Sequence, residues 1–319
     1  MGCGASSAIV INLDRENGFF YAGEVVSGTV ELHVKDARLK ADEIDFKLLG
    51  IMGYSTTSTD PNRTATSSFN SNMDTNAEYR HVLFLLTKYV FAHPQGGVND
   101  LTYSQGRYSW PFQFQLPDNI PPTLSLPKAY PHVQYSLQVA IDKAWYKRKL
   151  QETRYIGVFP HINLLQQPNL LKPTIFGNHN RKDIIIKGVL SKIGCVPGEF
   201  IDVKIEIENP QRVLIKQIHM SIIQSCQVER DSYSRKLATC VIPDLIQRRD
   251  ERMEKTFEIM IPDSRLPPSF QFKGGIKKTG AVSISYNCKI EVNAEGLFTD
   301  FDIVIPITLG TDPKPQPST

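Results

Sequence analysis

The first residues of the chain are suited to covalent modification by fatty acids. The sequence Met-Gly-Cys-Gly-Ala-Ser-Ser fits the N-myristoylation pattern M-G-x-x-x-[ST], with Gly2 as the acceptor and Ser6 in the hydroxyl position. Cys3 lies where a second acyl chain is commonly attached. One myristoyl chain gives an association constant on the order of 10⁴ M⁻¹ for membranes, whereas two chains bind stably. We therefore expect lipidation at Gly2 and Cys3, and the alternative is a frayed terminus of small residues.

A cationic segment is the second group of residues with binding chemistry. It reads Lys-Ala-Trp-Tyr-Lys-Arg-Lys, and its four cations are Lys143, Lys147, Arg148 and Lys149. Cations next to aromatic residues can bind phosphorylated peptides or anionic lipid. The segment therefore predicts a contact with cargo or lipid, and a solvated strand end is the equally simple alternative.

A polar segment interrupts the hydrophobic pattern from Ser55 to Asn76. It consists almost wholly of Ser, Thr, Asn and Asp, and its only large apolar residues are Phe69 and Met73. Such a segment buries too little apolar surface to offset the entropy lost on ordering. We expect a mobile loop that begins at Ser55, either as a partner contact or as a disordered hairpin insertion. Its many hydroxyl groups would also suit phosphorylation.

Motifs for catalysis and metal binding are missing from the sequence. It contains no Gly-x-Ser-x-Gly, no His-Glu-x-x-His and no phosphate-binding loop, and its seven histidines are scattered. His33 lies near Asp36, but we expect it to face solvent on a strand. The five cysteines include no Cys-x-x-Cys pair, which indicates reduced thiols in the cytosol and no zinc site. We expect a protein that is not an enzyme and needs no cofactor.

Composition excludes several of the remaining classes of protein. The 319 residues suffice for two domains of ordinary size, and a net charge of +3 gives no general attraction for nucleic acid. No apolar run is long enough for a transmembrane helix. An extracellular adhesion domain would need a signal peptide and paired cysteines, and the sequence has neither.

Alternation of apolar and polar residues predicts an all-β protein. Tyr135, Leu137, Val139 and Ile141 share one face of a strand, and no stretch shows a helical period longer than two or three turns. The segment Tyr79 to Phe91 is more continuously apolar. We therefore expect it to be a central strand that is covered on both faces.

Three sequence echoes, in the same order, indicate a tandem duplication. Near the start of each copy a Gly-Glu pair, Gly23-Glu24 or Gly198-Glu199, precedes a strand. Later an alternating strand ends at a Pro-Pro crossover, Pro121-Pro122 or Pro267-Pro268. The third echo pairs Gly157-Val-Phe-Pro-His-Ile with Ile303-Val-Ile-Pro-Ile-Thr. The glycine allows a turn with positive φ, and the prolines stiffen the crossover.

The echoes predict five segments. These are a leader at residues 1–7, a domain at 8–165, a linker at 166–180, a second domain at 181–310 and a flexible tail at 311–319.

The motifs at Ala22 to Val30, Trp110 to Val139 and Val196 to Asn209 together resemble the arrestin fold, specifically the arrestin domain-containing proteins (α-arrestins). The resemblance covers roughly residues 8 to 310. It implies two tandem arrestin-like, immunoglobulin-like β-sandwich domains. It also implies an adaptor that binds the cytoplasmic regions of membrane-protein cargo and directs endocytic or endosomal sorting. Such a protein would be cytoplasmic and peripheral on the plasma membrane or endosomes, and the loop from Ser55 to Asn76 would correspond to a cargo-contacting loop.

The chain departs from the α-arrestin pattern at one point. Many α-arrestins recruit ubiquitin ligases through Pro-Pro-x-Tyr motifs, and this sequence contains none. The sequence therefore does not decide whether the protein recruits a ubiquitin ligase. A retromer-type sorting subunit of the same fold, which works by assembling with partner proteins, is the alternative function.

Overall fold

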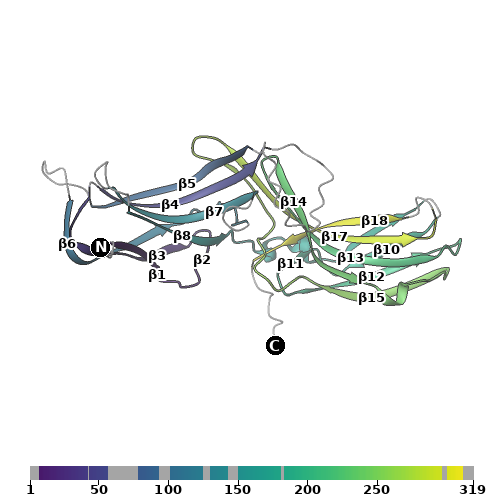
Figure 1. Ribbon diagram of the computed structural model, residues 1–319. Helices are drawn as coiled ribbons and strands as arrows, with labels where there is room; N and C mark the ends of the chain where they lie inside the picture. Colours follow the sequence, from purple (N-terminus) through teal and green to yellow (C-terminus); the bar gives the residue numbers. More distant parts are fainter. Residues whose placement is uncertain are drawn as a thin grey trace, which may run out of the picture.

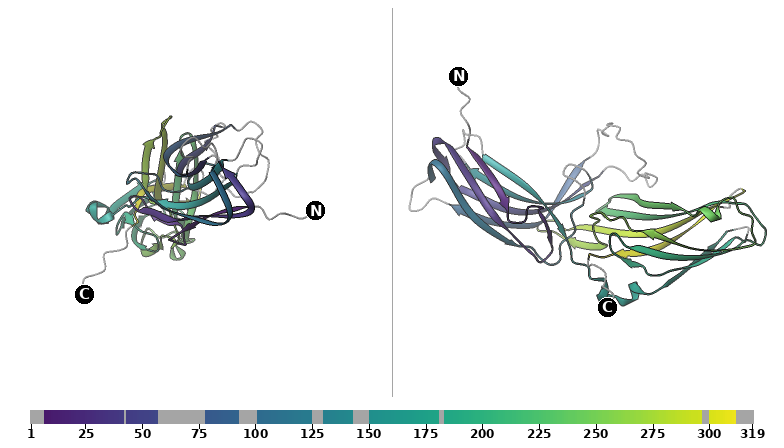
Figure 2. Two further views of the ribbon diagram at one scale, coloured as in Figure 1. Left: turned by 90° about the vertical axis from the view of Figure 1, so that its left-hand side faces the viewer. Right: turned by 90° about the horizontal axis from the view of Figure 1, so that it is seen from below.

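The computed structural model describes residues 7–41, 43–56, 78–92, 101–124, 130–142, 150–180, 183–296 and 300–311. Predictions for Gly2, Cys3, Phe69, Met73 and the cationic segment 143–149 lie outside these residues. The described chain forms two β-sandwiches that lie end to end (Figures 1 and 2). The predicted all-β class with two tandem sandwiches is confirmed.

The N-terminal domain packs a three-stranded sheet on a five-stranded sheet. The first has the order β1 (Ala8–Leu13), β3 (Val25–Ala41) and β6 (Leu101–Gln115). The second has the order β2 (Phe19–Tyr21), β8 (Leu150–Phe159), β7 (His132–Asp142), β4 (Glu43–Ser55) and β5 (Tyr79–Ala92). Side chains alternate between solvent and the space between the sheets. Phe46 and Phe114, one from each sheet, are fully buried with ring centroids 5.0 Å apart.

The C-terminal domain packs a four-stranded sheet on a six-stranded sheet. The first has the order β15 (Arg252–Met260), β12 (Phe200–Glu208), β10 (Ile185–Leu190) and β9 (Thr174–His179). The second has the order β11 (Gly194–Cys195), β18 (Phe301–Leu309), β17 (Gly280–Ala294), β13 (Ile215–Val228) and β14 (Asp231–Val241), with β16 (Phe270–Gly274) paired to β17. The 3-10 turn η3 (Pro243–Leu245) follows β14.

Two 3-10 turns and a strand occupy the segment between the domains. The turns are η1 (Leu164–Gln166) and η2 (Pro168–Leu171), and the Asn163 side chain accepts a hydrogen bond from the Leu165 N–H at 2.8 Å. The second half of the predicted linker forms β9, which pairs with β10 throughout its length. The residues that only connect the two sandwiches are therefore few.

The Gly-Glu turns have the same geometry in both domains. Gly23 and Gly198 both adopt φ of +82°, a conformation that L side chains rarely occupy. In each turn the following glutamate accepts a hydrogen bond from the backbone N–H three residues before it, at 2.8 Å for Glu24 and 3.0 Å for Glu199. Each copy of the echo therefore forms the same turn, in which the glutamate carboxylate accepts a hydrogen bond from a backbone N–H.

The Pro-Pro crossovers are also equivalent. The hydroxyl of Tyr135 donates to the Pro121 carbonyl at 2.5 Å, and the hydroxyl of Tyr286 donates to the Pro267 carbonyl at 2.5 Å. Burial raises the pKa of both tyrosines, so both hydroxyl groups keep the proton that they donate. This shared bond confirms the predicted equivalence of the two crossovers.

The prediction that Tyr79 to Phe91 forms a central strand is wrong. This segment belongs to β5, which is the edge strand of its sheet, and Leu86 and Val90 are more than 40% exposed. Part of its apolar character has another cause, because the Phe84 ring packs on Phe272 of the C-terminal domain. A long-range contact between domains therefore produced a pattern that resembles two-sided burial within one sheet.

Candidate functional site: the interdomain face

A hairpin of the C-terminal domain reaches the N-terminal domain. It consists of β16, the turn after it and the start of β17, and it extends toward β4 and β5 (Figure 1). The Ile276 N–H donates to the Leu83 carbonyl at 2.9 Å, and the rings of Phe84 and Phe272 meet edge to face at 5.6 Å. A backbone bond and an aromatic contact are thus among the links between the two sandwiches.

Polar contacts flank this junction. Lys278 Nζ donates to the Tyr54 hydroxyl at 3.1 Å, and the Ser55 N–H donates to Asp231 Oδ2 at 2.8 Å. Ser55, which was expected to begin the polar loop, is the last residue of β4. The start of the polar segment at Ser55 is therefore next to the C-terminal domain.

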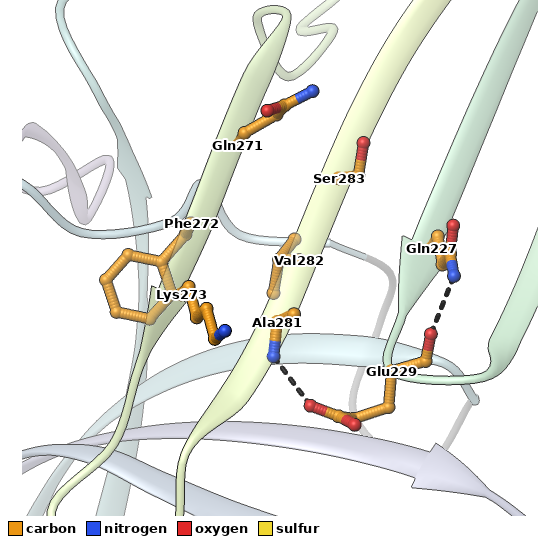
Figure 3. Close-up of a pocket in the computed structure, with 8 residues that line it drawn as sticks. All are labelled: Gln227, Glu229, Gln271, Phe272, Lys273, Ala281, Val282 and Ser283. Carbon is orange, nitrogen blue, oxygen red and sulfur yellow. Dashed lines mark hydrogen bonds between the residues drawn. The ribbon is translucent and has the colours of Figure 1, made fainter.

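An open groove of about 380 Å³ lies beside the hairpin on the C-terminal domain (Figure 3). Gln271, Ser283 and Gln227 are register partners in one row across β16, β17 and β13. In the next row Lys273 is opposite Ala281, whose N–H donates to Glu229 Oε1 at 2.7 Å. The groove therefore presents amides, a hydroxyl and one charge of each sign.

Glu229 shapes the end of this groove. It has φ of +57° in the turn between β13 and β14, and its backbone carbonyl accepts a hydrogen bond from Gln227 Nε2 at 2.7 Å. Its carboxylate bonds to β17, so one residue connects the turn to two strands (Figure 3). Small-molecule sites mostly enclose their ligand, whereas this groove is open and combines polar side chains with the apolar Phe272 and Val282, so it fits a macromolecular surface better.

The described part of the chain contains no group of three or more His, Cys, Asp or Glu residues that could hold a metal ion. Its four cysteines are free thiols. Burial raises the pKa of Cys195 to about 12, so that thiol stays protonated at neutral pH and is a poor nucleophile. The geometry of the interdomain face supports the binding of another molecule.

The residues proposed from sequence and those found at the junction hardly overlap. Ser55 is the one predicted site residue that the structure describes, and it lies at the interdomain face. Asp231, Lys278 and Glu229 were missed because each resembles an ordinary surface charge in the sequence. Only their pairing with distant residues distinguishes them, and no local pattern reports it.

Comparison with known proteins agrees with the two-domain β-sandwich class. The family model "Arrestin (or S-antigen), N-terminal domain" matches residues 9–165, and "Arrestin (or S-antigen), C-terminal domain" matches residues 180–314. The chain therefore belongs to the arrestin family, as its motifs predicted. Arrestin-family proteins are in general adaptors without enzymatic activity.

A curated relative shows the same resemblance over most of the chain. Arrestin domain-containing protein A of Dictyostelium discoideum is 20% identical over 305 residues, which cover 91% of this chain and 49% of that protein. The chain thus spans about half the length of this relative. In the described residues no helix combines the length and the apolar character needed to cross a membrane.

Proposed function

We propose that this arrestin-family protein is a trafficking adaptor that binds cytoplasmic regions of membrane-protein cargo and directs endocytic or endosomal sorting. The observation that supports this proposal most is the interdomain face. Hydrogen-bonding side chains line an open groove beside the hairpin that joins the domains, and Ser55, where the polar segment begins, bonds to Asp231 at this junction. Arrestin-family proteins generally bind receptor cargo, which agrees with a macromolecular partner.

The groove suits an extended polar segment of a cargo protein. Within the described sheet, β16 pairs with β17 on one side only, so part of its backbone can hydrogen-bond to an added strand. Gln271, Ser283 and Gln227 can both donate and accept hydrogen bonds from one row. In this proposal backbone pairing supplies affinity, and these side chains select polar sequences.

The membrane location is part of the proposal. Acylation of Gly2 and Cys3 would keep the protein at the cytoplasmic face of the plasma membrane or endosomes, where cargo tails are concentrated. Lys143, Lys147, Arg148 and Lys149 would contact anionic lipid or acidic cargo, and Phe69 and Met73 would serve as apolar contacts in the polar loop.

Proximity labelling in living cells tests this proposal. The wild-type protein should label membrane proteins with cytoplasmic tails together with endosomal proteins. A groove variant carrying Gln271→Ala and Lys273→Glu should keep its membrane neighbours and lose cargo. The matched control is Lys187→Glu, a charge reversal on the exposed face of β10 in the other sheet. A wild-type set made up of soluble enzymes or nuclear proteins would contradict the proposed function.

The acylation proposal has its own test. Mass spectrometry of the N-terminal peptide should find a myristoyl group on Gly2 and a thioester on Cys3. Gly2→Ala should become soluble, and Cys3→Ser should bind membranes weakly and exchange quickly. An unmodified wild-type terminus, or a Gly2→Ala protein that stays on membranes unchanged, would show that cargo alone recruits the protein.

A further inference from the structure

A second pocket, of about 320 Å³, lies between the two domains and shares no lining residue with the groove in Figure 3. The N-terminal domain contributes Phe19, Thr123 and Phe159, and the C-terminal domain contributes Tyr233, Arg235 and Arg265. Leu124 and Pro267, both buried, complete an apolar base. Interfaces between domains are a common place for ligand sites because walls from both sides can enclose a molecule.

This pocket has an unbalanced positive charge. Its lining contains two arginines and no carboxylate, whereas the groove in Figure 3 has one lysine and one glutamate. A pocket on β12 and β15 has the opposite excess, with three glutamates and one arginine. Among the residues that the structure describes, neither Arg235 nor Arg265 forms an ion pair. The chain therefore holds two uncompensated guanidinium groups around one recess.

Arg235 is positioned by a buried hydrogen-bond network. Its Nε donates to Gln224 Oε1 at 2.6 Å, and Gln224 has no exposed surface. Gln224 Nε2 in turn donates to the Tyr286 hydroxyl at 2.6 Å, which donates to the Pro267 carbonyl. A guanidinium has five N–H donors, so a bond through Nε fixes the group and leaves the Nη donors for a ligand.

Arg265 is positioned from the other domain. Its Cζ lies 4.3 Å from the centroid of the Phe19 ring, so the cation stacks on an aromatic face across the domain boundary. Stacking leaves the edge of the guanidinium plane accessible to hydrogen-bond acceptors. Nearby, Thr123 Oγ1 accepts a bond from the Val158 N–H at 2.9 Å, and its hydroxyl proton can be donated to a ligand.

We infer that this pocket binds an anion bearing a phosphoryl group and that the bound anion bridges the two domains. Two guanidinium groups provide paired donors that match phosphate oxygens, and the partly apolar surroundings strengthen these charge-assisted bonds. Because Thr123 and Phe19 come from one domain and both arginines from the other, occupancy stabilises one relative position of the sandwiches. The inference does not depend on the proposed adaptor function.

Isothermal titration calorimetry with inorganic pyrophosphate tests the site, using full-length protein at constant ionic strength. Wild type should show saturable binding. Arg235→Gln and Arg265→Gln should each weaken binding by about tenfold or more, since each removes a charge-assisted contact. The matched control is Arg252→Gln, an exposed arginine on β15 outside this pocket, and it should bind like wild type.

The outcomes separate a built site from general charge attraction. Absence of saturable binding to wild type, or equal weakening by all three variants, would overturn the inference. Unfolding curves without ligand should coincide for wild type, Arg252→Gln and Arg265→Gln. Arg235→Gln loses a bond to buried Gln224, so its circular dichroism spectrum should show that it is folded under the titration conditions. A Gln224→Leu variant should weaken pyrophosphate binding less than Arg235→Gln, because it removes the support and keeps the charge.

Vesicles distinguish a lipid headgroup from a soluble anion. Flotation with phosphatidylcholine vesicles that contain phosphatidic acid, compared with phosphatidylcholine alone, should use the full-length Gly2→Ala protein, which cannot be myristoylated. Binding that is lost in Arg235→Gln and Arg265→Gln assigns the phosphoryl group to a lipid. Binding of pyrophosphate by wild type without arginine-dependent flotation assigns it to a soluble compound. Cargo labelling that fails while pyrophosphate binds would contradict only the adaptor proposal.

Discussion

The two domains contain the same buried tyrosine hydrogen bond, but the residue opposite the tyrosine differs. In the N-terminal domain Tyr135 is the register partner of Gly50, and in the C-terminal domain Tyr286 is the register partner of Gln224. A Cβ at position 50 would lie 2.7 Å from ring carbons of Phe84, so this aromatic ring fills the space that a side chain would take. In the other copy Gln224 fills that space.

This single difference determines what each domain contributes to the junction. Phe84 packs edge to face on Tyr135 at 5.4 Å and also contacts Phe272 of the other domain. Gln224 instead connects Tyr286 to Arg235, which lines the interdomain pocket. The copies thus kept the crossover that orders the sandwich and diverged at the adjacent position, one toward aromatic packing and one toward polar recognition.

The largest expected effect comes from removing the tyrosine hydroxyls. Tyr286→Phe leaves both the Pro267 carbonyl and the Gln224 amide without a partner, whereas Tyr135→Phe affects only the Pro121 carbonyl. A buried unsatisfied group costs about 1–3 kcal/mol, so we expect a loss of about 3 kcal/mol for Tyr286→Phe and about 1.5 kcal/mol for Tyr135→Phe. Denaturant unfolding measures both, with the exposed Tyr89→Phe as control. Equal losses would remove the distinction between the copies.

Adding a methyl group at position 50 tests the packing of Phe84. Gly50→Ala should cost about 1–3 kcal/mol because the new Cβ overlaps the ring. A Phe84→Leu background removes the overlap with the ring but keeps Leu85 Cβ at 2.9 Å, so the cost of Gly50→Ala should fall by about 1 kcal/mol without vanishing. A double-mutant cycle on unfolding free energies gives this coupling, and strict additivity would contradict the contact.

The repeated turns should respond unequally to alanine. Gly23→Ala and Gly198→Ala each force an L residue to positive φ, which costs about 1–2 kcal/mol. At position 23 the Cβ would also lie 2.5 Å from Asp118 Oδ1, whereas at position 198 the nearest Asp263 atom is 3.4 Å away. Gly23→Ala should therefore be the more destabilising of the two in thermal unfolding. Because φ is the same at both positions, a greater loss for Gly198→Ala would contradict the role of the Asp118 contact.

The smallest effect concerns the pH dependence of the first turn. The hydrogen bond from Arg15 lowers the pKa of Glu24 below its ordinary value of 4.5. A lowered folded-state pKa stabilises the fold above the unfolded pKa, and this contribution is lost as pH falls through the folded value. The stability difference between wild type and Glu24→Gln should therefore be larger at about pH 7 than at about pH 3. A difference that grows in acid would contradict the pairing.

The repeated turns and crossovers could be predicted because each depends on adjacent residues. Gly23-Glu24 and Gly198-Glu199 encode the turn locally, and Pro121-Pro122 and Pro267-Pro268 encode the stiff crossover. The family and the fold followed from these motifs. By contrast, the apolar segment that forms β5 was misassigned because the Phe84 side chain packs on Phe272, almost 200 positions away.

The residues of the junction and the pocket could not be predicted for the same physical reason. Arg235 and Arg265 are 30 positions apart and resemble ordinary surface cations in the sequence. Their common pocket depends on how two sandwiches meet, and the role of Gln224 depends on strand register with Tyr286. The Gly50 and Gln224 difference could not be read from the sequence either, because the two tyrosines are 286 − 135 = 151 positions apart and the residues opposite them are 224 − 50 = 174 positions apart.

Site-specific photocrosslinking in cells tests most directly whether the interdomain face is the working surface of this arrestin-family protein. A benzoylphenylalanine residue replaces either Lys273 in the groove or Lys187 on the outer face of β10. If cargo binds at the interdomain face, position 273 should form covalent adducts with membrane proteins, and position 187 should form few or none. Equal adducts from both positions, or adducts from position 187 alone, would contradict it.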